Sequence, residues 1–205
     1  MKSPLFLCFF GLLFFACNEP LDEVEVKDDS GQVIERFTVL KGTFTRDGRY
    51  QAFYPSGELM EEAYYANDTL NGLRRMFYEN GTVQIEEHYE MGKFIGSFKA
   101  YHANGKLELA GEYINNAMEG EWRGYYDNGQ LREVVLFSGN QENGPFVEYY
   151  DNGNVKAEGT YLNGDTEQGL LQEYNEEGVL VRKAECDNGA CKTIWTLESG
   201  DVQSN

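Results

Sequence analysis

The chain has 205 residues, 41% of them hydrophobic, which is enough for one or two domains with a core of their own. Its 23 Gly, 14 Tyr and 13 Phe against 4 Pro favour many short strands and turns over helices. With 35 acidic and 17 basic residues, the formal net charge is −18. Because like charges repel, we expect no nucleic-acid partner.

The beginning of the chain has the organisation of a targeting segment. Lys2 gives it a positive start, and the thirteen residues 4–16 form an apolar run. A helix that crosses a bilayer needs about 20 residues, so the run is too short to span but suits the core of a signal peptide. The run ends at Ala16-Cys17, where the sequence turns polar. We therefore predict a signal peptide over residues 1–16.

A small residue directly before a cysteine resembles the signal of bacterial lipoproteins, although Phe14 stands where that family usually has Leu or Val. The resemblance implies that Cys17 is diacylated and anchors the protein in the bacterial cell envelope, where two acyl chains hold firmly. We expect the outer membrane, on its periplasmic or surface side. The alternative is an ordinary signal peptide with an incidental cysteine. Residues 17–29 are acidic and lack aromatic residues, and we interpret them as a tether.

A motif of about 24 residues recurs six times between residues 48 and 191. Each copy is centred on one glycine, called here the loop glycine: Gly57, Gly81, Gly105, Gly129, Gly153 and Gly178. Nine residues before it stands a second glycine: Gly48, Gly72, Gly96, Gly120, Gly144 and Gly169. Four residues before it stands an aromatic residue: Phe53, Phe77, Tyr101, Tyr125, Tyr149 and Tyr174. Two residues after it stands Leu or Val, and eight residues after it Tyr or Phe, with Cys186 in the last copy.

The residues around the loop glycine predict a β-hairpin. Four copies have Asn directly before this glycine, a pair typical of hairpins because glycine readily adopts a positive φ. In the first copy, Pro55 favours a three-residue loop built on a type I turn over a two-residue turn. That loop pairs Phe53 with Leu59, and alternation then places Tyr65 on their side of the sheet. We therefore predict that these three positions of each copy form the core face.

A second turn is predicted between one copy and the next. Eleven residues after each loop glycine stands Gly, Asn or Asp, which tolerate left-handed backbone: Asp68, Gly92, Asn116, Asn140, Gly164 and Gly189. The sequence thus predicts an all-β protein with an elongated single antiparallel sheet of tandem β-hairpin repeats. Residues 48–191 hold the six repeats, residues 30–47 an N-terminal capping strand or hairpin, and residues 192–205 a C-terminal cap strand and tail.

The repeat resembles the MORN family (membrane occupation and recognition nexus) in its bacterial variant. The clearest copy runs from Gly120 to Leu131 with the sequence GEWRGYYDNGQL. The resemblance implies scaffolding or binding roles with lipid or protein contacts, and an occasional label as antitoxin of a toxin–antitoxin pair.

No motif predicts catalysis, and we expect no enzyme activity, no cofactor and no metal. His88 and His102 occupy positions where other copies have other residues, without partners at metal-ligand spacing. Cys186 and Cys191 flank the last turn and predict a disulfide in an oxidising envelope. A redox pair is the alternative, although the spacing is not CxxC.

A further set of aromatic residues is expected on the face opposite the predicted core. They stand three or seven residues before the loop glycines: Tyr54, Tyr78, Phe98, His102, Trp122, Tyr126, Phe146 and Tyr150. Either these rings stack and stiffen the array, or they hold an extended protein or glycan partner. We expect a monomeric, lipid-anchored envelope scaffold that binds such a partner. The alternatives are an antitoxin-like neutralising protein and an enzyme accessory subunit.

Overall fold

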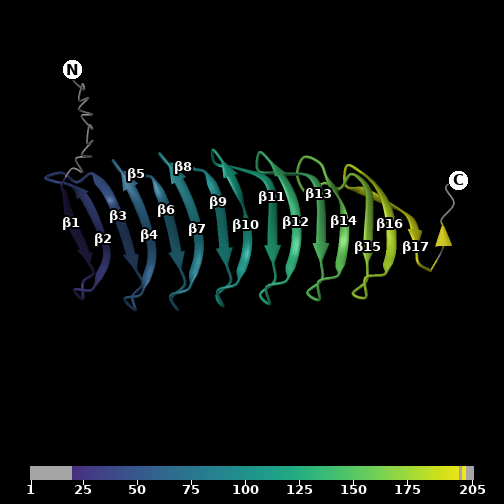
Figure 1. Cartoon of the computed structure of the whole chain (residues 1–205), viewed down its shortest axis with the longest axis horizontal. Helices are drawn as coiled ribbons and strands as arrows, with labels where there is room; N and C mark the ends of the chain where they lie inside the picture. The colour runs from purple at the N-terminus through teal and green to yellow at the C-terminus, as the bar shows by residue number, and fades with distance from the viewer. Residues whose placement is uncertain (1–19, 199, 202–205) are drawn as a thin grey trace, which may run out of the picture.

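The computed structural model describes residues 20–198 and 200–201, and this part of the chain forms strands and turns without a helix. The strands lie side by side in one elongated sheet, and every strand pairing is antiparallel (Figure 1). The strands are β1 Leu21–Lys27, β2 Val33–Leu40, β3 Arg46–Phe53, β4 Leu59–Ala66, β5 Thr69–Leu70, β6 Gly72–Phe77, β7 Val83–Glu90, β8 Lys93–Phe94, β9 Gly96–Tyr101, β10 Leu107–Ile114, β11 Ala117–Tyr125, β12 Leu131–Ser138, β13 Gln141–Tyr149, β14 Val155–Tyr161, β15 Gly169–Tyr174, β16 Leu180–Asp187, β17 Ala190–Thr196 and β18 Gly200–Asp201. The short strands β5 and β8 pair with the same strands, β4 and β7, as the segments that follow them, β6 and β9. The expected all-β fold of tandem hairpins is confirmed.

Two predictions concern residues that the structure does not describe. The signal peptide over residues 1–16 and the lipid-bearing Cys17 lie outside the described residues. Within the described residues, no helix has the length and apolar character needed to cross a membrane.

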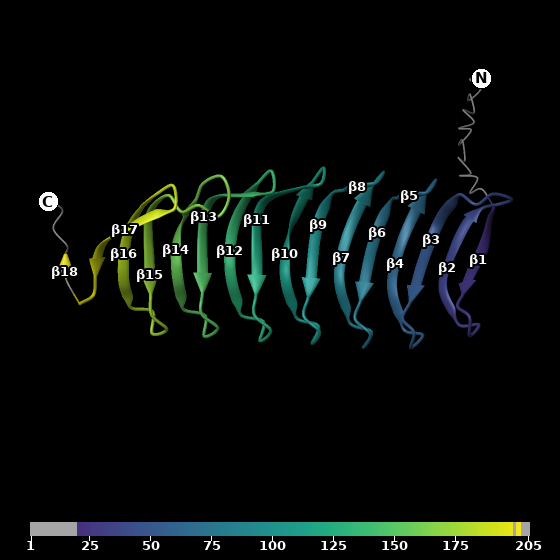
Figure 2. The same cartoon turned by 180° about the vertical axis from the view of Figure 1, so that it is seen from behind.

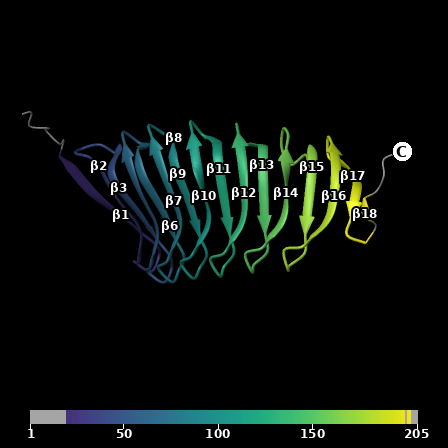
Figure 3. The ribbon, with the colours of Figure 1, turned by 45° about the vertical axis from the view of Figure 1, so that its right-hand side comes forward.

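The predicted three-residue loops, each with its loop glycine, connect the strands at one of their two ends (Figure 3). In the first loop the amide of Gly57 donates to the carbonyl of Tyr54 at 2.8 Å, and the amide of Tyr54 donates to Glu58 at 2.8 Å. Gly57 has a φ of 90°, a conformation that side chains disfavour. Phe53 pairs with Leu59, as predicted. The loop type and the pairing next to it could thus be obtained from the sequence.

The turns between repeats lie at the opposite ends of the strands and have left-handed backbone at both central residues. Asn67 and Asp68 have φ of 49° and 61°, which is the pattern of a type I′ turn. The amide of Asp68 also donates to the carbonyl of Arg46, one repeat earlier, at 2.8 Å. The equivalent amide of every later turn makes the same kind of bond to the preceding repeat. The predicted second turn is therefore confirmed, and it also ties adjacent repeats together.

The two faces of the sheet are packed unequally. The buried residues of the described part lie on one face, called here the inner face: Val39, Ala52, Ala63, Glu87, Trp122, Val135, Phe146, Leu171, Ala184 and Cys186. Within residues 20–198 and 200–201 no second layer covers the sheet, so we attribute this burial to the bend of the strands (Figures 1 and 2), which brings side chains of neighbouring strands together. The opposite side is called the outer face.

The predicted core face was wrong beyond the loop. Ala52 pairs with Glu61 although the next residue, Phe53, pairs with Leu59, so the returning strand contains one extra residue. Such a bulge shifts the alternation of side chains by one position. As a result Tyr65 does not share the face of Phe53.

The aromatic positions of the repeat are therefore distributed differently from the prediction. Tyr65 packs on the inner face against Tyr50, with ring centroids 5.9 Å apart. Phe53 lies on the outer face, where the guanidinium of Arg36 is 5.8 Å from its ring. The inner face consequently carries the residues seven before and eight after each loop glycine, most of which are aromatic.

The N-terminal boundary also differs from the prediction. Residues Leu21–Lys27, assigned above to a tether, form β1 and pair along their whole length with β2. Alternating Val24 and Val26 suit a strand, and Arg36 of β2 binds Glu25 at 2.9 Å, which offsets the acidic charge of the segment. The charged side chains of this edge strand also disfavour pairing with another sheet.

Candidate functional site

The eight aromatic and histidine residues expected to form a binding face do share one face, but it is the packed inner face. Trp122 and Phe146 are only 2% and 4% exposed. The ring of Trp122 contacts Phe98, Tyr113 and Phe137, with centroids 5.6, 5.2 and 5.9 Å away. The expectation that these rings lie opposite the core is wrong, because the bulge after the loop reverses the alternation on which it was based.

The five residues directly before the loops link one repeat to the next through side-chain hydrogen bonds to backbone carbonyls. The hydroxyl of Tyr54 donates to the carbonyl of Phe77 at 2.7 Å, and the hydroxyl of Tyr126 donates to Tyr149 at 2.7 Å. Tyr78 and Tyr150 make the same bond, and His102 places Nε2 3.0 Å from the equivalent carbonyl. These side chains therefore have a structural task along the array.

Large and small residues alternate on the inner face. The indole of Trp122 lies over Gly111, where a Cβ would come within 2.2 Å of the ring. Phe146 lies in the same way over Gly159, where a Cβ would be 2.8 Å from Cε1. Each ring thus depends on a glycine of an adjacent strand for its place in the single layer.

The second repeat interrupts the series of rings with charge. Arg74 occupies the position that carries an aromatic ring in four other copies, and its guanidinium binds Glu61 at 2.7 Å and Glu87 at 2.9 Å. The hydroxyl of Tyr89 also donates to Glu87. Burial lowers the pKa of Arg74, but the two carboxylates outweigh burial and raise that pKa above its usual value.

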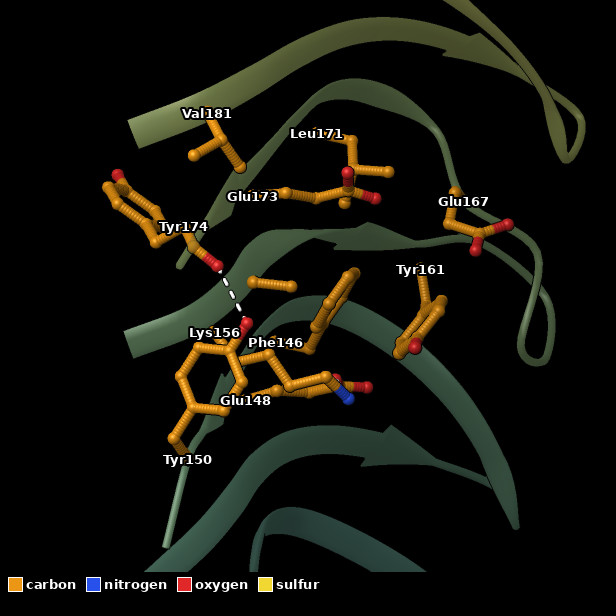
Figure 4. A pocket seen from close by; sticks show the side chains of 11 residues that line it. Phe146, Glu148, Tyr150, Lys156, Tyr161, Glu167, Leu171, Glu173, Tyr174 and Val181 are labelled. Carbon is orange, nitrogen blue, oxygen red and sulfur yellow. Dashed lines mark hydrogen bonds and ion pairs between the residues drawn. The ribbon is translucent and has the colours of Figure 1, made fainter. Parts of the chain in front are cut away.

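A cavity of about 370 Å³ opens on the inner face between β13 and β16 (Figure 4). The rings of Phe146 and Tyr161 stack in it, with centroids 4.0 Å apart and planes inclined by 16°. The carboxylates of Glu148, Glu167 and Glu173 stand around these rings, together with one lysine, Lys156. This cavity combines an aromatic floor with an acidic rim.

A second cavity, of about 230 Å³, lies on the neighbouring strands β10 to β13. Its walls include Trp122, Val135, Glu133 and Glu142. The indole Nε1 of Trp122 is buried and has no hydrogen-bond partner among the residues that the structure describes. An unpaired buried donor costs free energy, and a ligand acceptor would satisfy this N–H after a movement of the indole, because the atom has almost no exposed surface.

Acidic charge accumulates around the two cavities. Burial and the nearby carboxylates of Asp165 and Glu133 raise the pKa of Glu142. Burial and surrounding glutamates, with Glu148 the strongest, raise the pKa of the Tyr161 hydroxyl to about 12. A positive charge placed between these groups would relieve their mutual repulsion.

The last turn carries the predicted cysteine pair. Cys186 and Cys191 face each other across β16 and β17 and are joined by a disulfide. Cys186 is 2% exposed and belongs to the inner-face core with Leu171 and Ala184. No group of three or more His, Cys, Asp or Glu within the described residues is arranged to hold a metal ion.

The acidic residues of the cavities were missed in the sequence analysis. Glu148 and Glu173 occur five residues before their loop glycines, a position that other copies fill with residues of various types. This position lies on the inner face because the bulge next to the loop shifts the alternation of side chains by one residue. A pattern search that allowed for one extra residue after the loop would have found them.

Comparison with known proteins gives one family. The model described as "MORN repeat variant" matches five consecutive segments that together make up more than half of the chain: residues 46–67, 70–91, 95–115, 118–138 and 142–163. The sixth repeat lies beyond the matched residues. No curated protein matches the chain.

Several solved structures match at low identity. The structure described as "Crystal structure of GtfA/B complex bound to UDP and GlcNAc" is 14% identical, with a TM-score of 0.23 over 53% of this chain and 21% of that chain. "Crystal Structure of TcdB2-TccC3-Cdc42" is also 14% identical, with a TM-score of 0.18 over 84% of this chain and 13% of that chain. The matched part of this chain therefore spans about a fifth or less of the length of each of these proteins.

Proposed function

Since the chain belongs to the MORN repeat variant family, we propose that it is a non-catalytic scaffold of the bacterial cell envelope. It is held to the membrane by diacylated Cys17, acts as a monomer and binds a protein partner on the inner face of its repeats. The observation that carries this proposal is the pair of adjoining cavities, which span neighbouring repeats and are lined by stacked rings and carboxylates.

The outer face has a cavity of about 520 Å³, but it is a weaker candidate because cations lie among its carboxylates and several of its charges are paired. Arg49 binds Glu62 at 2.6 Å, and Arg75 binds Glu86 at 3.1 Å. The inner face instead holds the carboxylates of Glu142 and Glu167, which have no hydrogen-bond or ion-pair partner within the described residues. A partner with positive charges that pair with these carboxylates therefore gains more binding free energy on the inner face than on the outer face.

The bonds between repeats suit a binding role. Tyrosine hydroxyls tie the loops together, and turn amides tie the opposite ends of the strands. A surface that is already ordered loses little conformational entropy when a partner binds. The repeats thus present a preformed surface.

The short distance from the lipid also favours a role close to the membrane. Strand β1 starts at Leu21, four residues after Cys17. Four residues span at most about 14 Å when fully extended. An anchored chain would therefore hold its first strand near the bilayer surface, with the array projecting from there.

The anchor is tested by replacing Cys17 with serine. We expect Cys17→Ser to abolish the incorporation of radiolabelled palmitate and to move the protein from the membrane fraction to the soluble fraction, because the acyl chains have lost their attachment site. The wild-type chain is the control. Labelling that persists in the Cys17→Ser variant would contradict the lipid anchor.

The binding face is tested by filling the inner-face cavity of about 370 Å³. Ala157 lines it, and Ala157→Trp should prevent any partner from entering, whatever its chemistry. The matched control is Ala110→Trp, since Ala110 lies on the outer face. Proteins captured from envelope extract by the immobilised full chain should be lost with Ala157→Trp and retained with Ala110→Trp. An identical set captured by both variants would overturn the inner-face assignment.

A further inference from the structure

We infer that the inner-face cavities between β10 and β16 bind an extended basic peptide segment, with a Lys or Arg side chain seated in the cavity lined by Phe146 and Tyr161. This inference rests on the proposed function, because it names the chemistry of the partner that the inner face accepts.

The floor of the larger inner-face cavity suits an organic cation. Tyr161 is half-buried and lines the cavity, while Phe146, only 4% exposed, stacks behind it, and the face of an aromatic ring attracts an ammonium or guanidinium group. A volume of about 370 Å³ accepts the head and aliphatic stem of one long side chain. In Figure 4 the rings lie at the centre of the cavity, with carboxylates on more than one side of them.

The rim of the cavity is short of positive charge. Lys156 binds Glu148 at 2.9 Å, and Arg182 binds Glu173 at 2.7 Å. The carboxylate of Glu167, which also lines the cavity, has no partner of this kind within the described part of the chain. A cation from a ligand would complete this set of ion pairs.

The neighbouring cavity also has an unpaired carboxylate, and in addition it has a hydrogen-bond donor without an acceptor. Glu142 is unpaired and stands near Asp165 and Glu133, while Arg132 binds Glu133 at 2.6 Å. The Nε1 donor of Trp122 is buried in a side chain that is only 2% exposed, and it lacks a partner among the described residues. A site that lacks both a cation and a hydrogen-bond acceptor matches a peptide, which has basic side chains and backbone carbonyls.

Two other ligand classes fit the site less well. A metal ion needs carboxylates that converge on one point, and no such group of three occurs within residues 20–198. A free polyamine would supply cations but no carbonyl for Trp122. The peptide is the class that meets both requirements.

The distance between the cavities agrees with this choice. Trp122 on β11 and Phe146 on β13 are two strands apart, which corresponds to about 10 Å in a sheet. An extended chain covers about 10 Å in three residues. A segment in the polyproline II form of an extended chain has three residues per turn, so a basic residue at every third position lies on the same side and would place equivalent groups in both cavities.

The test measures the binding of fluorescein-labelled acetyl-(Gly-Gly-Lys)₃-amide to the full chain by fluorescence anisotropy, at about 0.15 M salt to screen the overall charge. In the Glu142→Gln/Glu167→Gln variant, we expect the dissociation constant to rise about tenfold or more, because two unpaired carboxylates of the site are neutralised. The Glu112→Gln/Glu185→Gln variant makes the same change in net charge on the outer face, where both side chains are exposed, and should stay within about twofold of wild type. Unchanged thermal unfolding of both variants establishes that they are folded.

The outcomes separate the peptide inference from the proposed function. Equal weakening by the two double variants would mean general attraction to an acidic protein and would overturn the basic-peptide site. No binding of the peptide to wild type would overturn it as well. If Ala157→Trp then still loses its captured partners, the inner face remains the binding surface and only the class of partner is wrong.

Discussion

Replacing Trp122 with alanine is expected to lower the free energy of unfolding by about 3–5 kcal/mol, the usual cost of removing a large buried aromatic side chain. The ring is 2% exposed and touches Phe98, Tyr113 and Phe137. It also covers the backbone of Gly111, so its loss would leave a cavity that no second layer can fill. Urea denaturation followed by circular dichroism measures the change.

The matched control for Trp122→Ala is another aromatic side chain that packs against nothing. Phe44 is 95% exposed, and Phe44→Ala should change the free energy of unfolding by no more than about 0.5 kcal/mol. A loss of stability in Trp122→Ala as small as that in Phe44→Ala would show that the inner-face ring cluster does not stabilise the sheet.

Replacing Arg74 with methionine is expected to cost about 3 kcal/mol of stability. Methionine keeps much of the length of the side chain but removes the charge, which leaves Glu61 and Glu87 facing each other without a counterion. Glu87 is only 9% exposed, so water screens it poorly. Thermal and urea unfolding at neutral pH would measure the loss.

Two further variants show whether the charge cluster causes that loss. Arg49→Met removes a more exposed ion pair, with Glu62, and should cost only about 0–1 kcal/mol. The triple variant Glu61→Gln/Arg74→Met/Glu87→Gln removes all three charges together and should recover most of the stability. If the triple variant is no more stable than Arg74→Met, the packing of the arginine stem, and not its charge, is what the second repeat requires.

The charge cluster and the cavities divide the inner face into regions with different tasks. Around Arg74 every formal charge is paired and partly buried, which is the arrangement of a structural element. Around Phe146 and Tyr161 the carboxylates outnumber the cations and border open space. The proposed binding function therefore belongs to the C-terminal half of the array.

Repeat period, loop type and turn type could be predicted from the sequence because each depends on residues that are neighbours in the chain. A three-residue loop requires a positive φ at its last residue, and Gly57 supplies it in the first loop. Asp68 supplies left-handed backbone in the first turn between repeats. The pairing of Phe53 with Leu59 follows from the loop alone. Cys186 and Cys191 are likewise placed opposite each other by the turn that they flank. Lipidation of Cys17 is still a prediction from the sequence.

The tertiary structure decided which side of the sheet is packed and where a partner could bind. One extra residue after each loop reverses the alternation of side chains, and its effect appears only when two strands are paired. That reversal places Trp122 and Phe146 in the core and brings Glu142 and Glu167, which lie 25 residues apart in the sequence, to adjoining cavities. β1 is a strand for a similar reason: its acidic residues Glu23 and Glu25 gain Arg36 as a counterion across the pair with β2. Local geometry is encoded within a few residues of chain, whereas burial and charge compensation depend on neighbours that only the assembled sheet supplies.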